Sequence, residues 1–202
     1  MEVFKMKQNK STMISLILGI VSVLFAFLTI IMYIVVEREA WDYVIEIFSL
    51  IAFGGLLALI ILNMLNIKFN HLLFFIPLGV IVLVNLLSGI RSLIAIGDAY
   101  ETSRYSYFTS FIISILSIGL LISMTYGLYK MGNKKVFFII PVSYIIISNV
   151  FSFLYSFNQV IFSFFTVAET KYALVSFFDR ISVILFYVIY IIFFVKNNSE
   201  NK

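Results

Sequence analysis

Long apolar runs dominate the chain, and short polar segments separate them. A helix that crosses about 30 Å of hydrocarbon needs roughly 20 mostly apolar residues. Six runs reach that length: residues 11–36, 44–66, 72–96, 108–129, 136–165 and 177–195. The pattern predicts an all-α integral membrane protein, built as a bundle of six transmembrane helices. The segments between the runs are too short for a separate soluble domain, so residues 1–202 are predicted to form one membrane domain.

The composition excludes several other classes of protein. Hydrophobic residues make up 62% of the chain and charged residues 12%, whereas about a quarter of the residues in a soluble domain are charged. A water-soluble globule and a disordered chain are therefore excluded. The chain has no cysteine, which excludes disulfides, thiolate metal sites and a cysteine nucleophile. No cofactor is predicted.

Charged residues divide unevenly between the two predicted sides of the membrane. One side carries two acids and nine cations, which are Lys5, Lys7, Lys10, Lys68, Lys130, Lys134, Lys135, Lys196 and Lys202. The other side carries five cations and eight acids. Because cytoplasmic loops are enriched in lysine and arginine, the first side is predicted to be cytoplasmic. Both termini are then on the cytoplasmic side of the cell membrane. The cationic side then faces the anionic lipid headgroups of the bilayer, which accounts for the formal net charge of +4. No nucleic-acid partner is therefore predicted.

Two of the apolar runs share a pattern at an offset of 64 residues. Pro77 aligns with Pro141, and a pair of phenylalanines lies just before each proline. The same offset aligns Asn85 with Asn149. This pattern predicts an internal repeat of three helical hairpins in parallel orientation, related by an axis along the membrane normal. Chance similarity between two runs rich in isoleucine and phenylalanine is the alternative.

The sequence offers few groups for catalysis. His71 is the only histidine, so neither a histidine-based triad nor a multi-histidine metal site can be built. The ionisable residues nearest to the centres of the runs are Glu46, Arg91, Asp179 and Arg180, all within about two turns of the predicted outer interface. Neutral centres argue against proton-driven or ion-driven transport, because such transport needs ionisable groups inside the membrane. Neither an enzyme nor a metal site is predicted.

Candidate ligand-binding residues lie at the outer ends of the runs. They are Trp41, Tyr43, Glu46, Arg91, Asp98, Glu101, Tyr105, Glu169, Tyr172 and Asp179. In one interpretation these side chains line the mouth of an outward-facing pocket for a small molecule. In the other, the aromatic residues form an interfacial belt and the charged residues extend to the headgroups. The guanidinium of Arg91 is expected to pair either with Asp98 or Glu46, or with a carboxylate or phosphate of a ligand.

Two further sets of residues are predicted to hold helices together. Asn85 and Asn149 lie near the middle of the membrane, where buried amides usually bond across helices. Small residues recur along one stripe of the first run as Ser15, Gly19, Ser22 and Ala26. Such a stripe allows a second helix to approach closely. That helix belongs either to the same bundle or to a partner membrane protein that docks on the first helix.

The overall format resembles the substrate-binding subunits of energy-coupling-factor vitamin importers. The shared features are the length of 202 residues, six spans, both termini inside and the small-residue stripe. In that family the stripe docks the coupling subunit and the outer loops cap a vitamin. The resemblance is one of format, so no site residues are carried over.

Three functions are compatible with these features. We expect a non-enzymatic solute-binding or transport component with an outward-facing pocket. The alternatives are an accessory, immunity or sensor protein that acts through helix and loop contacts, and a self-contained channel or carrier. The bias towards isoleucine, asparagine, lysine and phenylalanine suggests a bacterial source with an AT-rich genome.

Overall fold

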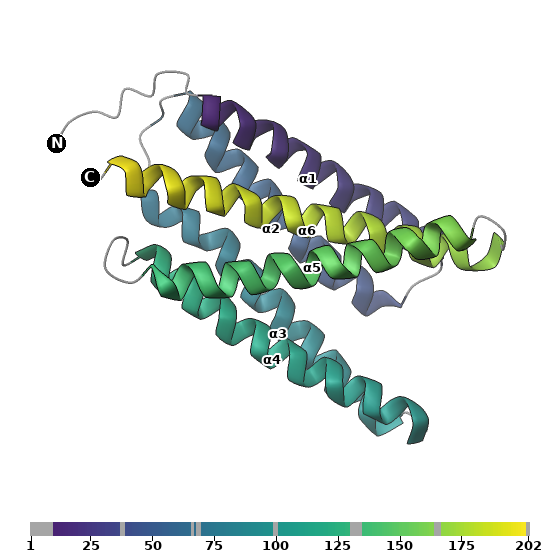
Figure 1. The fold of residues 1–202 in the computed structure, drawn as a ribbon. Helices are drawn as coiled ribbons and strands as arrows, with labels where there is room; N and C mark the ends of the chain where they lie inside the picture. Colours follow the sequence, from purple (N-terminus) through teal and green to yellow (C-terminus); the bar gives the residue numbers. More distant parts are fainter. Residues whose placement is uncertain are drawn as a thin grey trace.

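The computed structural model describes residues 10–36, 39–65, 67, 70–98, 101–129, 135–163 and 167–200. Within these residues the chain forms six long α-helices and no strand (Figure 1). Their bounds are α1 Lys10–Val35, α2 Ala40–Met64, α3 Phe75–Asp98, α4 Glu101–Tyr129, α5 Val136–Ser163 and α6 Val167–Glu200, and a short 3-10 turn, η1 His71–Phe74, precedes α3. Each long helix contains an apolar stretch of sufficient length to cross a membrane. The predicted all-α architecture with six membrane-length helices is confirmed in this part of the chain.

Three helices begin at least four residues earlier than the apolar runs predict. α2 begins at Ala40 rather than residue 44, α4 at Glu101 rather than 108, and α6 at Val167 rather than 177. A helix extends as far as its backbone hydrogen bonds are made, and it needs an apolar sequence only where it contacts lipid. The early start of α6 matters most, because the membrane-length stretch of α6 is Thr170–Val195.

The helices pack in chain order, each against the next, and α6 completes the series by packing against α1. Figure 1 shows that α1 begins and α6 ends at the same end of the bundle. We call this end the inner end, and we call the end at which α2, α4 and α6 begin the outer end. Large apolar side chains are exposed on all six helices, as expected of a surface that contacts lipid.

α6 lies against several of the other helices. The ring of Phe186 packs on Phe53 of α2, with centroids 5.0 Å apart. Near the inner end, the hydroxyl of the buried Tyr190 donates a hydrogen bond to the carbonyl of Phe74 in η1 at 2.8 Å. α6 also packs along α1 and α5. The hydroxyl of Tyr190 is therefore placed inside the bundle rather than towards lipid.

The small-residue stripe of α1 faces the interior of the bundle. Ser15, Gly19, Ser22 and Ala26 are all buried. Ser22 Oγ donates a hydrogen bond to the Ser182 carbonyl of α6 at 2.8 Å, and a Cβ on Gly19 would lie 3.0 Å from Leu57 Cδ1 of α2. Of the two interpretations of the stripe, the structure fits packing within the chain, because α2 and α6 already cover these residues.

α4 and α5 cross closely at the inner end. A Cβ on Gly127 would lie 2.5 Å from the backbone nitrogen of Phe138, so the crossing requires glycine. Ser123 Oγ donates a hydrogen bond to the Phe137 carbonyl at 3.1 Å across the same crossing. Figure 1 shows that the α3–α4 hairpin diverges from α5 and α6 towards the outer end.

Positions related by the offset of 64 residues have similar environments. Phe74 and Phe138 are both buried, and so are Ile81 and Ile145. Asn85 Nδ2 donates a hydrogen bond to the Ile81 carbonyl, and Asn149 Nδ2 donates to the Ile145 carbonyl. The rotation that would relate the hairpins stays a prediction.

Candidate functional site

Arg91 forms an ion pair at the outer end of the α2–α3 hairpin. Its guanidinium donates hydrogen bonds to the carboxylate of Asp42, and Nη2 also donates to Glu39 Oε2 at 3.0 Å. The side chain of Asp42 is 11% exposed and that of Glu39 is 74% exposed, so Asp42 is the buried partner.

This pairing differs from the one expected from the sequence, which names Asp98 or Glu46. The beginning of α2 lies beside the end of α3, because the two helices are neighbours in a hairpin. Asp42, in the first turn of α2, is therefore level with Arg91, whereas Glu46 lies one turn deeper. The side chain of Asp98 lies outside the described residues.

Glu46 is buried inside the bundle, and its carboxylate does not extend to the headgroups. Only 3% of the residue is exposed, although it lies in the second turn of α2. The charged groups that act on Glu46 are Asp179 and Arg180 of α6. The structure thus brings together two of the predicted ligand-binding residues, Glu46 and Asp179.

Asp179 and Arg180 lie close to the middle of the membrane-length stretch of α6. Arg180 is ten residues beyond Thr170, where that stretch begins, which corresponds to a depth of about 15 Å. Within Thr170–Val195 they thus lie close to the centre, whereas the sequence predicts a position near the outer interface and uncharged span centres. The cause is the helix boundary, because the apolar run begins ten residues after the helix does.

Arg180 is held by α5 as well as by its neighbour. Its Nη1 donates a hydrogen bond to Asn149 Oδ1 at 3.1 Å, and its Nε lies 3.7 Å from Asp179 Oδ2. Of the two asparagines predicted to bond across helices, Asn149 does so, whereas the hydrogen bond of the Asn85 amide stays within α3. We call Glu46, Asn149, Asp179 and Arg180 the polar cluster.

Two atoms of the polar cluster lack a hydrogen-bond partner. In the part of the chain that the structure describes, the buried side-chain nitrogen and oxygen atoms without a partner are Glu46 Oε1 and Arg180 Nε. The first is an acceptor and the second is a donor. Buried polar groups in folded proteins are almost always hydrogen-bonded, so a pair of unsatisfied atoms in one cluster requires an explanation, such as strain, a bound water molecule or another bound polar group.

The aromatic candidates lie apart from the polar cluster. Tyr105 is 78% exposed on α4, and Trp41 and Tyr172 are exposed on α2 and α6. Tyr43 packs edge-on against Tyr33 of α1, with ring centroids 5.9 Å apart. The outer end of α4, which carries Tyr105, diverges from the outer end of α6, which carries Tyr172 (Figure 1). Two further candidates, Glu101 and Glu169, have side chains outside the described residues.

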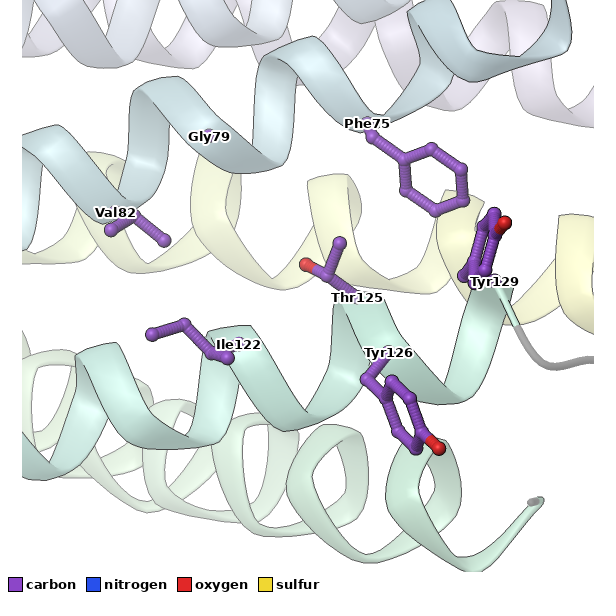
Figure 2. Close-up of a pocket in the computed structure, with 7 residues that line it drawn as sticks. All are labelled: Phe75, Gly79, Val82, Ile122, Thr125, Tyr126 and Tyr129. Carbon is purple, nitrogen blue, oxygen red and sulfur yellow. The ribbon is translucent and has the colours of Figure 1, made fainter.

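An apolar groove runs between α3 and α4 in the inner half of the bundle. Its volume is about 540 Å³, and it is lined by Phe75, Gly79, Val82, Ile122, Thr125, Tyr126 and Tyr129. Figure 2 shows the ring of Phe75 facing Tyr129 at one end of this groove, with Val82 and Ile122 further along it. The groove lies at the opposite end from the predicted outward-facing pocket, and it has no charged lining residue.

Neither metal-ligand geometry nor similarity to other proteins adds to this description. Among the described residues, no group of three or more histidine, aspartate or glutamate side chains could hold a metal ion. No known family model, curated protein or solved structure matches the chain. Any functional conclusion must therefore come from the polar cluster itself.

Sequence reasoning missed the centre of this site. Asn149 is predicted only as a packing residue, and Arg180 is not among the candidate ligand-binding residues. A signal was present, because Asp179-Arg180 is a charged pair within an otherwise apolar and aromatic stretch that continues on both sides. Because the residues from Val167 to Phe177 are also helical, that pair lies in the interior of α6 rather than near its beginning.

Proposed function

We propose that this multi-pass membrane protein is a non-enzymatic solute-binding or transport component of the cell membrane, with a site that opens to the outer side. The observation that carries this proposal is the position of Asp179 and Arg180 near the middle of the α6 span. Ionisable residues at such depth are costly, and in membrane proteins they mark sites and pathways for polar solutes.

The exposure of Arg180 supports access from water. Its side chain is 39% exposed, although it lies about 15 Å along the span. A guanidinium is far more stable in water than in hydrocarbon, so the exposed part of Arg180 faces a hydrated space. Arg180 is ten residues from the outer end of the stretch Thr170–Val195 and fifteen residues from its inner end, so the outer end provides the shorter route.

Two serines mark this route on the helices that carry the cluster. Ser152 lies three residues beyond Asn149 on α5, and Ser176 lies four residues before Arg180 on α6. Residues at these spacings share a helix face, so both serines lie on the outer side of the cluster and on its face. Both are partly exposed.

Cysteine accessibility tests the proposal, and the chain is suited to it because it contains no cysteine. Ser152→Cys and Ser176→Cys should each react with a charged, membrane-impermeant methanethiosulfonate added outside intact cells. The matched control is Leu154→Cys, at a similar depth on α5 but with a largely exposed apolar side chain, and it should stay unmodified. Thiols react as thiolates, which do not form in hydrocarbon.

A second control establishes that the reagent reaches the protein. Ser106→Cys, at an exposed position near the beginning of α4, should be labelled in the same preparation. If Ser106→Cys is labelled and neither Ser152→Cys nor Ser176→Cys is, the polar cluster has no outward access and the proposed function is wrong.

A further inference from the structure

We propose that the polar cluster binds a small zwitterion, with the ammonium group on Glu46 and the carboxylate group on Arg180. This inference rests on the proposed function and names the class of its solute. An amino acid, in which both charged groups are attached to one carbon atom, is the simplest ligand of this class.

The two unsatisfied atoms define the chemistry of the ligand. Glu46 Oε1 is an acceptor, and Arg180 Nε is a donor on a positively charged guanidinium. A cation alone would leave Arg180 Nε without a partner, and an anion alone would leave Glu46 Oε1 without one. A ligand that carries both an ammonium and a carboxylate group satisfies both atoms at once.

The partners already present orient Arg180 for this role. Asn149 accepts from Nη1, and this contact fixes one edge of the guanidinium against α5. Asp179 Oδ2 is 3.7 Å from Nε, which is beyond hydrogen-bond distance, so Nε–H is available. A planar guanidinium that is held on one side presents a defined donor edge to a carboxylate.

Glu46 is placed to receive the other end of the ligand. α2 and α6 both run inwards from the outer end, and Phe53 of α2 packs on Phe186 of α6. Glu46 lies seven residues before Phe53 and Asp179 seven residues before Phe186, so the two acids are at about the same level of the bundle. An ammonium group bound beside Glu46 favours the ionised form of its carboxyl group, because an opposite charge nearby stabilises that form.

The alternative is that Glu46 and Arg180 pair with each other in a rearranged empty site. The binding experiment separates this alternative from the proposal, because an internal ion pair gives no response to added solutes. It also separates single-charge ligands from zwitterions, because each half of the ligand can be tested alone.

The test is a thermal unfolding assay on the purified full-length chain in detergent, first with pools of the natural amino acids and then with single ones. A ligand that binds only the folded state raises Tm in proportion to the logarithm of its concentration once the site is saturated. We expect at least one amino acid to raise Tm, and we expect methylamine and acetate to leave it unchanged. Glycine betaine, whose ammonium has no N–H group, should also have no effect.

Variants locate the response. Glu46→Gln and Arg180→Gln should each lose the increase in Tm, because each removes the ionisable group that pairs with one end of the ligand. The matched control is Asp42→Asn, an acid-to-amide change one turn earlier on α2 in a separate ion pair, and it should keep the response. Retention of the response in Glu46→Gln would place the ligand elsewhere and overturn the proposal.

Each remaining outcome is decisive. A Tm increase with acetate alone or with methylamine alone would make the site an anion or a cation site and would overturn the zwitterion. If no amino acid raises Tm, the ligand class is wrong; labelling of Ser152→Cys then decides separately whether the outward site exists. If an amino acid does raise Tm, it should also slow the labelling of Ser152→Cys, because it occupies the same hydrated space.

Discussion

Arg180 of α6 donates a hydrogen bond from Nη1 to Asn149 Oδ1 of α5 at 3.1 Å, close to the middle of the membrane span. The Asn149 amide is itself oriented, because its Nδ2 donates to the Ile145 carbonyl at 2.8 Å. Asn85 makes the equivalent bond to the carbonyl of Ile81. The two asparagines thus share a local geometry, but Asn149 carries an additional contact with a charged group.

This difference predicts unequal costs for the same substitution. Asn149→Leu should lower the free energy of unfolding by about 1.5–3 kcal/mol, because it removes the acceptor of a charged donor inside the membrane. Asn85→Leu should cost less than about 1 kcal/mol, because its amide bonds only within its own helix in the part of the chain described. Unfolding in mixed detergent measures both values. Equal losses would show that the Arg180–Asn149 contact contributes nothing to stability.

The ion pair of Arg91 predicts that the stability of the protein depends strongly on Asp42 and weakly on Glu39. Asp42→Asn should destabilise the protein clearly, and a double-mutant cycle with Arg91→Gln should give a coupling energy of about 1–3 kcal/mol. Arg91→Lys should restore only part of the stability, since an ammonium does not reproduce the contacts of the guanidinium with two acids.

Glu39→Gln is the matched control for this cycle. Glu39 also contacts Arg91, but its side chain is largely exposed, so its coupling energy should stay below about 1 kcal/mol. Coupling of Arg91 to Glu39 as strong as that to Asp42 would contradict the distinction drawn from burial. Full stability of Arg91→Ala would show that the pair is incidental.

The fold was predictable from the sequence to the extent that lipid contact determines it. Six apolar runs correspond to six helices, because every membrane-crossing segment must satisfy its backbone hydrogen bonds internally. Hydropathy does not report where a helix continues into polar sequence. This is why the apolar pattern predicts that the last helix begins at residue 177, whereas α6 begins ten residues earlier, at Val167. Because of that single boundary, Asp179 lies in the interior of the helix rather than near its beginning.

The candidate site was predictable only in part, because its members come from three helices. Burial of Glu46 depends on α6 lying beside α2, and the order in which helices pack is not visible in hydropathy. The partner of Arg91 depends on the relative depth of α2 and α3, which is likewise a tertiary property. In contrast, the α1 stripe was recognisable, because close helix approach requires small residues at regular spacing.

The close crossing of α4 and α5 predicts that one glycine cannot be replaced. Gly127→Ala should lower the free energy of unfolding by about 1–3 kcal/mol, because the added methyl group would overlap the backbone of Phe138 and neither helix can yield locally. Gly119→Ala on the same helix is the control, because nothing lies within 4 Å of a Cβ there. It should be neutral or stabilising by up to about 1 kcal/mol. The same loss at both positions would point to helix propensity or lipid contact rather than to the crossing.

The sidedness of the protein is the last prediction, and the direction of the proposed site depends on it. Lysines concentrate at the inner end and acids at the outer end, so the inner end should be cytoplasmic. Ser103→Cys should therefore be labelled on intact cells by an impermeant maleimide, and Asn133→Cys should be labelled only after the membrane is permeabilised. Both positions are chosen from the sequence, in predicted connections on opposite sides. Labelling of Asn133→Cys and not of Ser103→Cys on intact cells would reverse the orientation, so that the route past Ser152 and Ser176 would open to the cytoplasm.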